Sequence, residues 1–151
     1  MSLSKNITNV LNSCIEAMKT VLPMELSISS PSVISQPFIH QSLSVLIGII
    51  GDERGRIIFD GNADTFTKIA EAMFGMRVEG EMLESFTGEL GNMICGNLAT
   101  FTAQKGITLD ITPPTVIAGS TKIYGFSKGI KLPISLGDYG NLTILLMLEQ
   151  K

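Results

Sequence analysis

Hydrophobic positions along the chain follow helical spacing in some stretches and strand-like runs in others. Between residues 5 and 22, apolar side chains recur every three or four positions, which predicts an amphipathic helix. A second helix is predicted over 64–74, with Asp64 as its N-cap and Gly75 just past its end. The longest helix is predicted over 82–104.

Apolar runs of strand length occupy the segments between these helices. The runs at 43–50 and 55–59 are joined by a short Gly-containing turn, which predicts a β-hairpin. Residues 24–42 are rich in Ser and Pro, and we expect an edge strand and a loop there because Pro cannot donate to a central ladder. Further strands are predicted over 107–111 continuing into 115–118, over 130–136, and over 142–148.

The predicted order is helix, strands, helix, then helix, strands. Because tight hairpins connect antiparallel neighbours, this order predicts an α+β fold with a mostly antiparallel sheet and long helices packed on it. A length of 151 residues is typical of a single domain, here 1–151. The order also suggests a pseudo-twofold repeat, with halves at 4–75 and 82–149.

Composition and charge exclude several classes of protein. The net charge of -3 provides no basic stripe to neutralise phosphates, so nucleic acid is not the expected partner. The longest apolar run, 45–51, is far shorter than the roughly 20 residues that a membrane span needs. Cys14 and Cys95 are expected to be free, buried thiols in a cytoplasmic protein. With a single His, neither a His/Cys metal cluster nor a Ser-His-Asp triad is expected.

The longest helix carries the most informative pattern, over residues 85–96. At 3.6 residues per turn, Phe86, Leu90 and Met93 fall on one apolar face. Glu89 and Asn92 are three positions apart on another face, so their side chains share one surface patch. The full stripe opposite the apolar face consists of Ser85, Glu89, Asn92 and Gly96.

Three glycines, Gly88, Gly91 and Gly96, interrupt this helix. Each interior Gly costs about 0.8–1.0 kcal/mol relative to Ala, so three independent sites cost about 2–3 kcal/mol. Close approach of another backbone would compensate for that cost. Spacing alone leaves two interpretations open. The glycines pack against a neighbouring element of the same fold, with Glu89 and Asn92 merely solvated, or they let a partner protein come close.

At these residues the sequence resembles the CheC/CheX/FliY family of chemotaxis phosphatases, and within it the single-motif CheX type. The family signature has Asp or Ser, then Glu four positions on, Asn three positions after that, and a Pro further along. Ser85, Glu89 and Asn92 match it, and Pro114 follows after 21 intervening residues. The resemblance covers roughly residues 5–149.

The resemblance implies a CheC-like α/β sandwich and a phosphatase that hydrolyses the aspartyl phosphate of a CheY-like response regulator. Glu89 and Asn92 would then be the catalytic residues, and Ser85, Gly88 and Gly96 would contact the partner. No cofactor is expected on this chain, whereas Mg²⁺ is expected on the response regulator. Because similar CheX proteins are homodimers, a homodimer is expected here too.

The chemistry of the two side chains fits this implied role. The Asn92 amide does not titrate near neutral pH, but it donates and accepts hydrogen bonds and could orient a water for in-line attack on phosphorus. The Glu89 carboxylate could pair with a lysine beside the partner's phosphorylated Asp. Two alternatives stay open: a non-catalytic module that binds a response regulator or docks like a flagellar-switch component, and an oligomer whose glycine-bearing helix is the interface.

Overall fold

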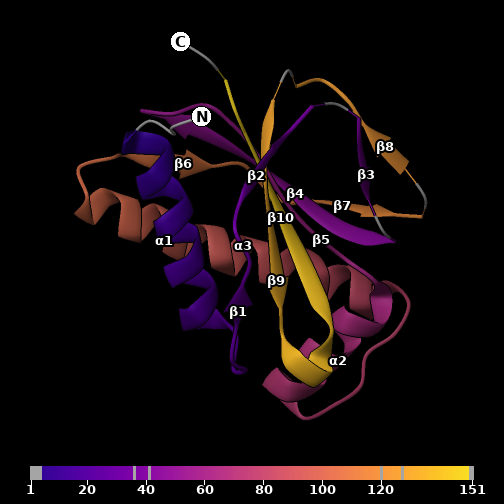
Figure 1. Cartoon of the computed structure of the whole chain (residues 1–151). Helices are drawn as coiled ribbons and strands as arrows, with labels where there is room; N and C mark the ends of the chain where they lie inside the picture. The colour runs from indigo at the N-terminus through magenta and orange to yellow at the C-terminus, as the bar shows by residue number, and fades with distance from the viewer. Residues whose placement is uncertain (1–4, 36, 41, 120, 127, 150–151) are drawn as a thin grey trace.

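The computed structural model describes residues 5–35, 37–40, 42–119, 121–126 and 128–149 (Figure 1). Its helices are α1 (Lys5–Val21), α2 (Ala63–Phe74), α3 (Glu81–Gln104) and the short 3₁₀ helix η1 (Gly137–Tyr139). Its strands are β1 (Ser27–Ile28), β2 (Ser32–Ile34), β3 (Phe38–His40), β4 (Leu43–Gly51), β5 (Gly55–Gly61), β6 (Leu109–Ile111), β7 (Thr115–Ala118), β8 (Thr121–Ile123), β9 (Gly129–Ser135) and β10 (Asn141–Leu148). The three predicted helices are confirmed. No helix within the described ranges combines the length and apolarity needed to cross a bilayer.

Eight strands form one sheet in which every pairing is antiparallel. The strand order is β1-β9-β10-β5-β4-β6, with β2 also paired to β9 and β7 also paired to β4. The predicted hairpin is confirmed, because Ile47 of β4 lies opposite Ile57 of β5. At the centre, β5 pairs with β10, which places Ile144 opposite Phe59. The α+β prediction is therefore confirmed, and β1 and β2 lie at the sheet edge as expected for 24–42.

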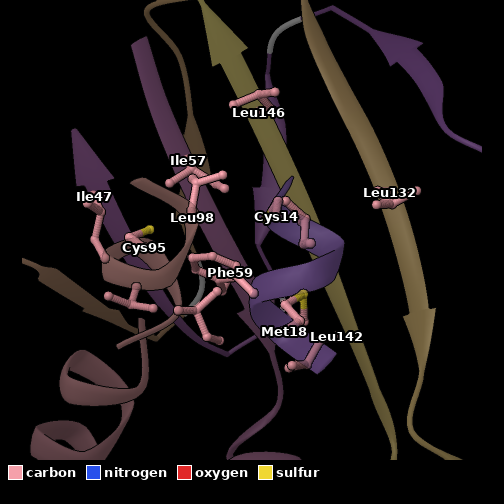
Figure 2. Close-up of a cluster of buried hydrophobic side chains, with 14 of the residues drawn as sticks. Cys14, Met18, Ile47, Ile57, Phe59, Cys95, Leu98, Leu132, Leu142 and Leu146 are labelled. Atoms are coloured by element: carbon pink, nitrogen blue, oxygen red, sulfur yellow. The ribbon is translucent and has the colours of Figure 1, made fainter. Parts of the chain in front are cut away.

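The main core lies between the sheet and the helices that cross one of its faces (Figure 1). Side chains alternate along a strand, so Ile57 and Phe59 point to this face. Figure 2 shows Cys14 and Met18 of α1 among these buried side chains, together with Cys95 and Leu98 of α3. Because α1 also packs on α3, the sheet and α1 together hold α3 in a fixed orientation.

Both cysteines are free and buried, as predicted. Burial raises the pKa of the Cys14 thiol from its ordinary value of 9.0 to about 12. Burial also raises the pKa of the Cys95 thiol, and the nearby Cys14 adds to that effect. The two side chains act as small hydrophobic groups of the core between α1 and α3.

The opposite face of the sheet has a second, smaller core. Ile58, Leu145 and Met147 point to this face, and Phe38, Ile123 and Phe126 cover them. Phe38 and Ile123 belong to β3 and β8, which form a separate two-stranded antiparallel sheet. The β8 strand is absent from the sequence prediction because it has a single apolar side chain, Ile123, and so forms no apolar run.

One predicted cap is wrong. The N-cap of α2 is Asn62, whose Oδ1 accepts a hydrogen bond from the Thr65 amide at 2.8 Å. Asp64 lies in the first turn instead, where it pairs with Lys68 at 3.2 Å. The extended backbone of Asn62 (ψ 162°) lets its side chain reach the free amide, which explains the earlier start of the helix. Gly75 ends α2 in the left-handed conformation (φ 74°), as predicted.

The pseudo-twofold repeat stays a prediction. The two hairpins that it relates, β4–β5 and β9–β10, lie side by side through the β5–β10 pairing. Each follows a long helix in the chain, α1 or α3, and both helices cover the same face of the sheet.

Candidate functional site

The candidate site lies on helix α3, whose N-terminus is well defined. Gly80 precedes the helix with a positive φ of 61°, and its carbonyl accepts from the Leu83 and Glu84 amides at 3.1 Å. Glu81 and Glu84 in the first turn interact favourably with the positive end of the helix dipole. The buried face includes Leu90, Ile94 and Leu98, which anchor the helix in the core.

Two of the three glycines serve helix-to-sheet packing. A methyl group on Gly91 would lie 2.6 Å from Cγ1 of Val45 in β4, so only a glycine permits this approach. A methyl group on Gly88 would lie 3.1 Å from Cγ2 of Val116 in β7. Both glycines are buried. The expectation that Gly88 faces a partner is therefore corrected, because α3 turns this position towards its own sheet.

The third glycine and the polar stripe lie on the other side of α3. Ser85 and Glu89 are exposed, and Asn92 is half-buried. Gly96 is exposed, and a methyl group added there would meet no atom within 4 Å. The structure thus brings Ser85, Glu89, Asn92 and Gly96 to one open surface of the helix.

The anchoring glycine explains this orientation. At about 100° per residue, Glu89 lies about 160° around the helix from Gly91, and Asn92 lies about 100° from it. Because Gly91 faces β4, Glu89 points away from the sheet and Asn92 lies at the boundary between the core and solvent. Half-burial of Asn92 leaves its side chain fewer orientations than a fully solvated residue has.

The polar side chains of this surface are not used inside the fold. Ser85, Glu89 and Asn92 make no side-chain hydrogen bond or ion pair with any residue that the structure describes. Asn97, five positions after Asn92, differs because its Nδ2 donates to the Met93 carbonyl at 2.9 Å. The Asn92 amide and the Glu89 carboxylate therefore remain available to an external group.

Two neighbours of the stripe had no specific contact in the sequence-based interpretation. Pro114, known there only as part of the signature, lies 3.9 Å from the methyl position of Gly88 and so borders α3. Phe86 is half-buried, and its ring meets that of Phe74 edge-on with 5.8 Å between centroids. A contact between α2 and α3 could not be found from spacing, because the two residues belong to different helices.

The candidate site is a helix surface rather than a cavity lining. A cavity with a volume of about 630 Å³ lies between the start of α1 and the turn after β4. Lys5, Asp52 and Lys105 are among its lining residues, whereas Glu89 and Asn92 are not. Within the described residues, no cluster of three or more His, Cys, Asp or Glu side chains could hold a metal ion.

Comparison with known proteins identifies relatives over nearly the whole chain. The family described as chemotaxis phosphatase CheX matches residues 43–129, which include all of α3. A protein of Thermotoga maritima, named CheY-P phosphatase CheX, is 37% identical over 134 residues, covering 86% of each chain.

Solved structures agree in fold. A CheC-like superfamily protein of Shewanella sp. PV-4 is 26% identical with a TM-score of 0.80, covering 98% of this chain and 100% of that one. The CheX–CheY–BeF3–Mg²⁺ complex of Borrelia burgdorferi is 24% identical with a TM-score of 0.77, covering 97% and 99%. The family match and the Thermotoga relative together show that this chain belongs to the chemotaxis phosphatase CheX family.

Proposed function

We propose that this protein is a CheY-P phosphatase, which hydrolyses the aspartyl phosphate of a CheY-like response regulator in chemotaxis. One observation carries the proposal: in a chain of the CheX family, Glu89 and Asn92 lie together on an open helix surface with no partner among the described residues. Support also comes from the Thermotoga relative, which is named for this activity.

Asn92 is proposed to orient the attacking water. Its amide accepts a hydrogen bond through Oδ1 and donates through Nδ2, so it can hold a water in line with the bond that breaks. The water oxygen bonds to phosphorus, the phosphorus–aspartate oxygen bond breaks, and the products are inorganic phosphate and the free carboxylate of the receiver. Holding one reactant in place in this way can lower the barrier by several kcal/mol. Because α3 is anchored by Gly91, that position is maintained before the partner arrives.

Glu89 is proposed to align the two proteins. Its side chain is exposed, and it is one turn away from Asn92 on the same helix. A carboxylate cannot attack or usefully approach an anionic phosphate, but it can pair with a lysine beside the phosphorylated aspartate. Such a pair fixes the register of the complex and excludes misaligned partners.

Ser85 and Gly96 are proposed to flank this contact. Ser85 lies one turn before Glu89, and its hydroxyl makes no hydrogen bond with a described residue. Gly96 lies one turn after Asn92, where the absence of a side chain leaves open space for a loop of the receiver.

Mg²⁺ is proposed to arrive with the receiver. The Borrelia complex contains CheX, CheY, BeF3 and Mg²⁺ together. The candidate surface of this chain has one carboxylate, Glu89, and a metal site needs several oxygen ligands. The ion would supply charge neutralisation at the transferring phosphoryl group, while this chain contributes position.

The oligomeric state and location of the protein belong to the same proposal. We expect a homodimer with one candidate site per protomer, acting in the cytoplasm where its receiver would be phosphorylated. Light scattering of the purified protein measures the dimer directly, and a monomeric mass would contradict this part of the proposal.

The activity is tested with a CheY-type receiver phosphorylated by acetyl phosphate in the presence of Mg²⁺. After removal of the donor, the decay of the phosphorylated receiver is followed with and without this protein. The proposal expects substoichiometric amounts of the protein to shorten the phosphoryl half-life at least tenfold. Binding without acceleration would support the non-catalytic docking module instead.

A further inference from the structure

An exposed apolar patch lies next to the candidate site. Six large hydrophobic side chains of the described residues are exposed, and three of them fall between residues 74 and 82. These three, Phe74 (62% exposed), Met76 (54%) and Met82 (61%), are called the α2–α3 patch below. Large side chains exposed together, rather than singly, mark a contact surface.

The α2–α3 patch is continuous with the motif surface. The Phe74 ring meets the Phe86 ring edge-on at 5.8 Å, and Phe86 is three positions before Glu89 on α3. Met82 precedes Glu89 by seven positions, which is two helical turns and about 10 Å along the axis on one face. A single protein face of ordinary size would therefore cover the patch and the Glu89–Asn92 pair together.

The charges around the patch define what can bind there. Glu71, Glu79, Glu81 and Glu84 are all exposed, and they surround it in sequence. Between residues 69 and 104 the only basic side chain is Arg77, which pairs with Glu79 at 3.2 Å. The segment that carries the exposed apolar side chains is thus acidic, and it complements an apolar surface with basic neighbours.

We propose that the α2–α3 patch is a second contact for the receiver and sets affinity and receiver choice. It would bind an apolar side chain flanked by Lys or Arg on the receiver, beside the phosphorylated aspartate. The inference rests on the proposed phosphatase function and adds a receiver contact outside the signature residues. Two of its three residues are methionines, whose flexible side chains adapt to a partner surface.

A contact of this kind acts on binding rather than on the chemical step. Met82, the patch residue on α3, precedes Asn92 by ten positions, or nearly three turns, so loss of the patch would leave the water-orienting amide in place. The expected signature is a raised KM with an unchanged kcat, because the contact is equally strong before and during hydrolysis.

The test compares the double variant Met76→Glu/Met82→Glu with the control Ile50→Glu. Ile50 is 41% exposed and lies on β4, opposite Asp110 of β6, away from the motif face of α3. Phosphate release is measured over a range of concentrations of a phosphorylated CheY-type receiver, and melting temperatures confirm that both variants fold. The double variant is expected to raise KM at least tenfold with kcat within twofold, and the control is expected to change neither.

Other outcomes overturn the inference separately from the proposed function. If the wild type is active and the double variant has an unchanged KM, the second contact is refuted and the proposed phosphatase function stands. If the wild type binds the receiver without accelerating hydrolysis, the proposed function fails. Calorimetry then tests the patch alone: an affinity at least tenfold lower for the double variant would support the second contact, and an equal affinity would overturn it. Conversion of a dimer to a monomer by the double variant would assign the patch to self-association and overturn the inference.

Discussion

Gly91 of α3 lies directly over Val45 of β4, so close that a methyl group would approach Val45 Cγ1 to 2.6 Å. This approach fixes both the height of α3 above the sheet and its rotation about its own axis. It turns Glu89 away from the sheet and leaves Asn92 at the edge of the core. The packing of one glycine therefore determines where the proposed catalytic side chains point.

Gly91→Ala is expected to destabilise the protein. Val45 is β-branched and fully buried, so it cannot move aside cheaply. Overpacking typically costs about 1–3 kcal/mol. The upper end of that cost exceeds the gain in helix propensity, which is about 0.8–1.0 kcal/mol. The net loss is then up to about 2 kcal/mol, and we expect the melting temperature to fall by up to about 8 °C in calorimetry. Adding Val45→Ala to Gly91→Ala should remove the clash and recover part of the lost stability. A melting temperature of Gly91→Ala at or above that of the wild type would contradict this packing.

Gly96→Ala is the matched substitution at an open position. A methyl group there meets no atom of the fold, so the variant should gain about 0.8–1.0 kcal/mol, or roughly 2–4 °C in melting temperature. The same methyl group would obstruct a receiver loop, which should lower turnover by roughly 5- to 100-fold. A stabilised variant with full activity would show that no part of the partner approaches Gly96.

Glu89→Ala is expected to separate binding from folding. The side chain is exposed and has no partner among the described residues, so the free energy of unfolding should change by less than about 0.5 kcal/mol. Loss of an ion pair to a receiver lysine should weaken the complex at least tenfold. Glu25→Ala, another exposed glutamate, serves as the control in binding titrations at two salt concentrations. If Glu89→Ala markedly lowers the melting temperature, Glu89 has a structural role.

The two thiols are expected to be inert in the folded protein. Burial keeps Cys14 protonated up to a pKa of about 12, and thiolate is the reactive form. Because the folded pKa is raised, the contribution of this thiol to stability is present below pH 9.0 and is lost as the pH rises towards 12. A thiol reagent at pH 8 should label Cys14 and Cys95 only after denaturation. Rapid labelling of the native protein would contradict the core packing.

The sequence predicts most of this fold because its long elements have clear periods. The hydrophobic stripe of α1, the β4–β5 hairpin and the extent of α3 are all visible in the order of apolar residues. The β8 strand and the N-cap of α2 are not visible in this way. The strand has a single apolar side chain, and the cap depends on whether the side chain of Asn62 or of Asp64 accepts the free amide.

For the candidate site, too, the sequence predicts some features and leaves others to the structure. Periodicity places Glu89 and Asn92 on one surface without structural information, because both lie on a single helix. The roles of the glycines depend on what faces each one across the fold, and spacing cannot distinguish Gly88 against Val116 from Gly96 against solvent. The α2–α3 patch is likewise a product of tertiary contact, since Phe74 reaches Phe86 only when both helices are packed.

A pair of asparagine variants tests whether the free amide of Asn92 orients the attacking water. Asn92→Ala is compared with Asn97→Ala, whose amide is already bonded to the Met93 carbonyl within α3. Decay of a phosphorylated CheY-type receiver is measured at saturating receiver. We expect Asn92→Ala to lower kcat at least 100-fold while the receiver still binds, and Asn97→Ala to stay within about threefold of the wild type. Equal activity of Asn92→Ala and the wild type would contradict this role of the amide.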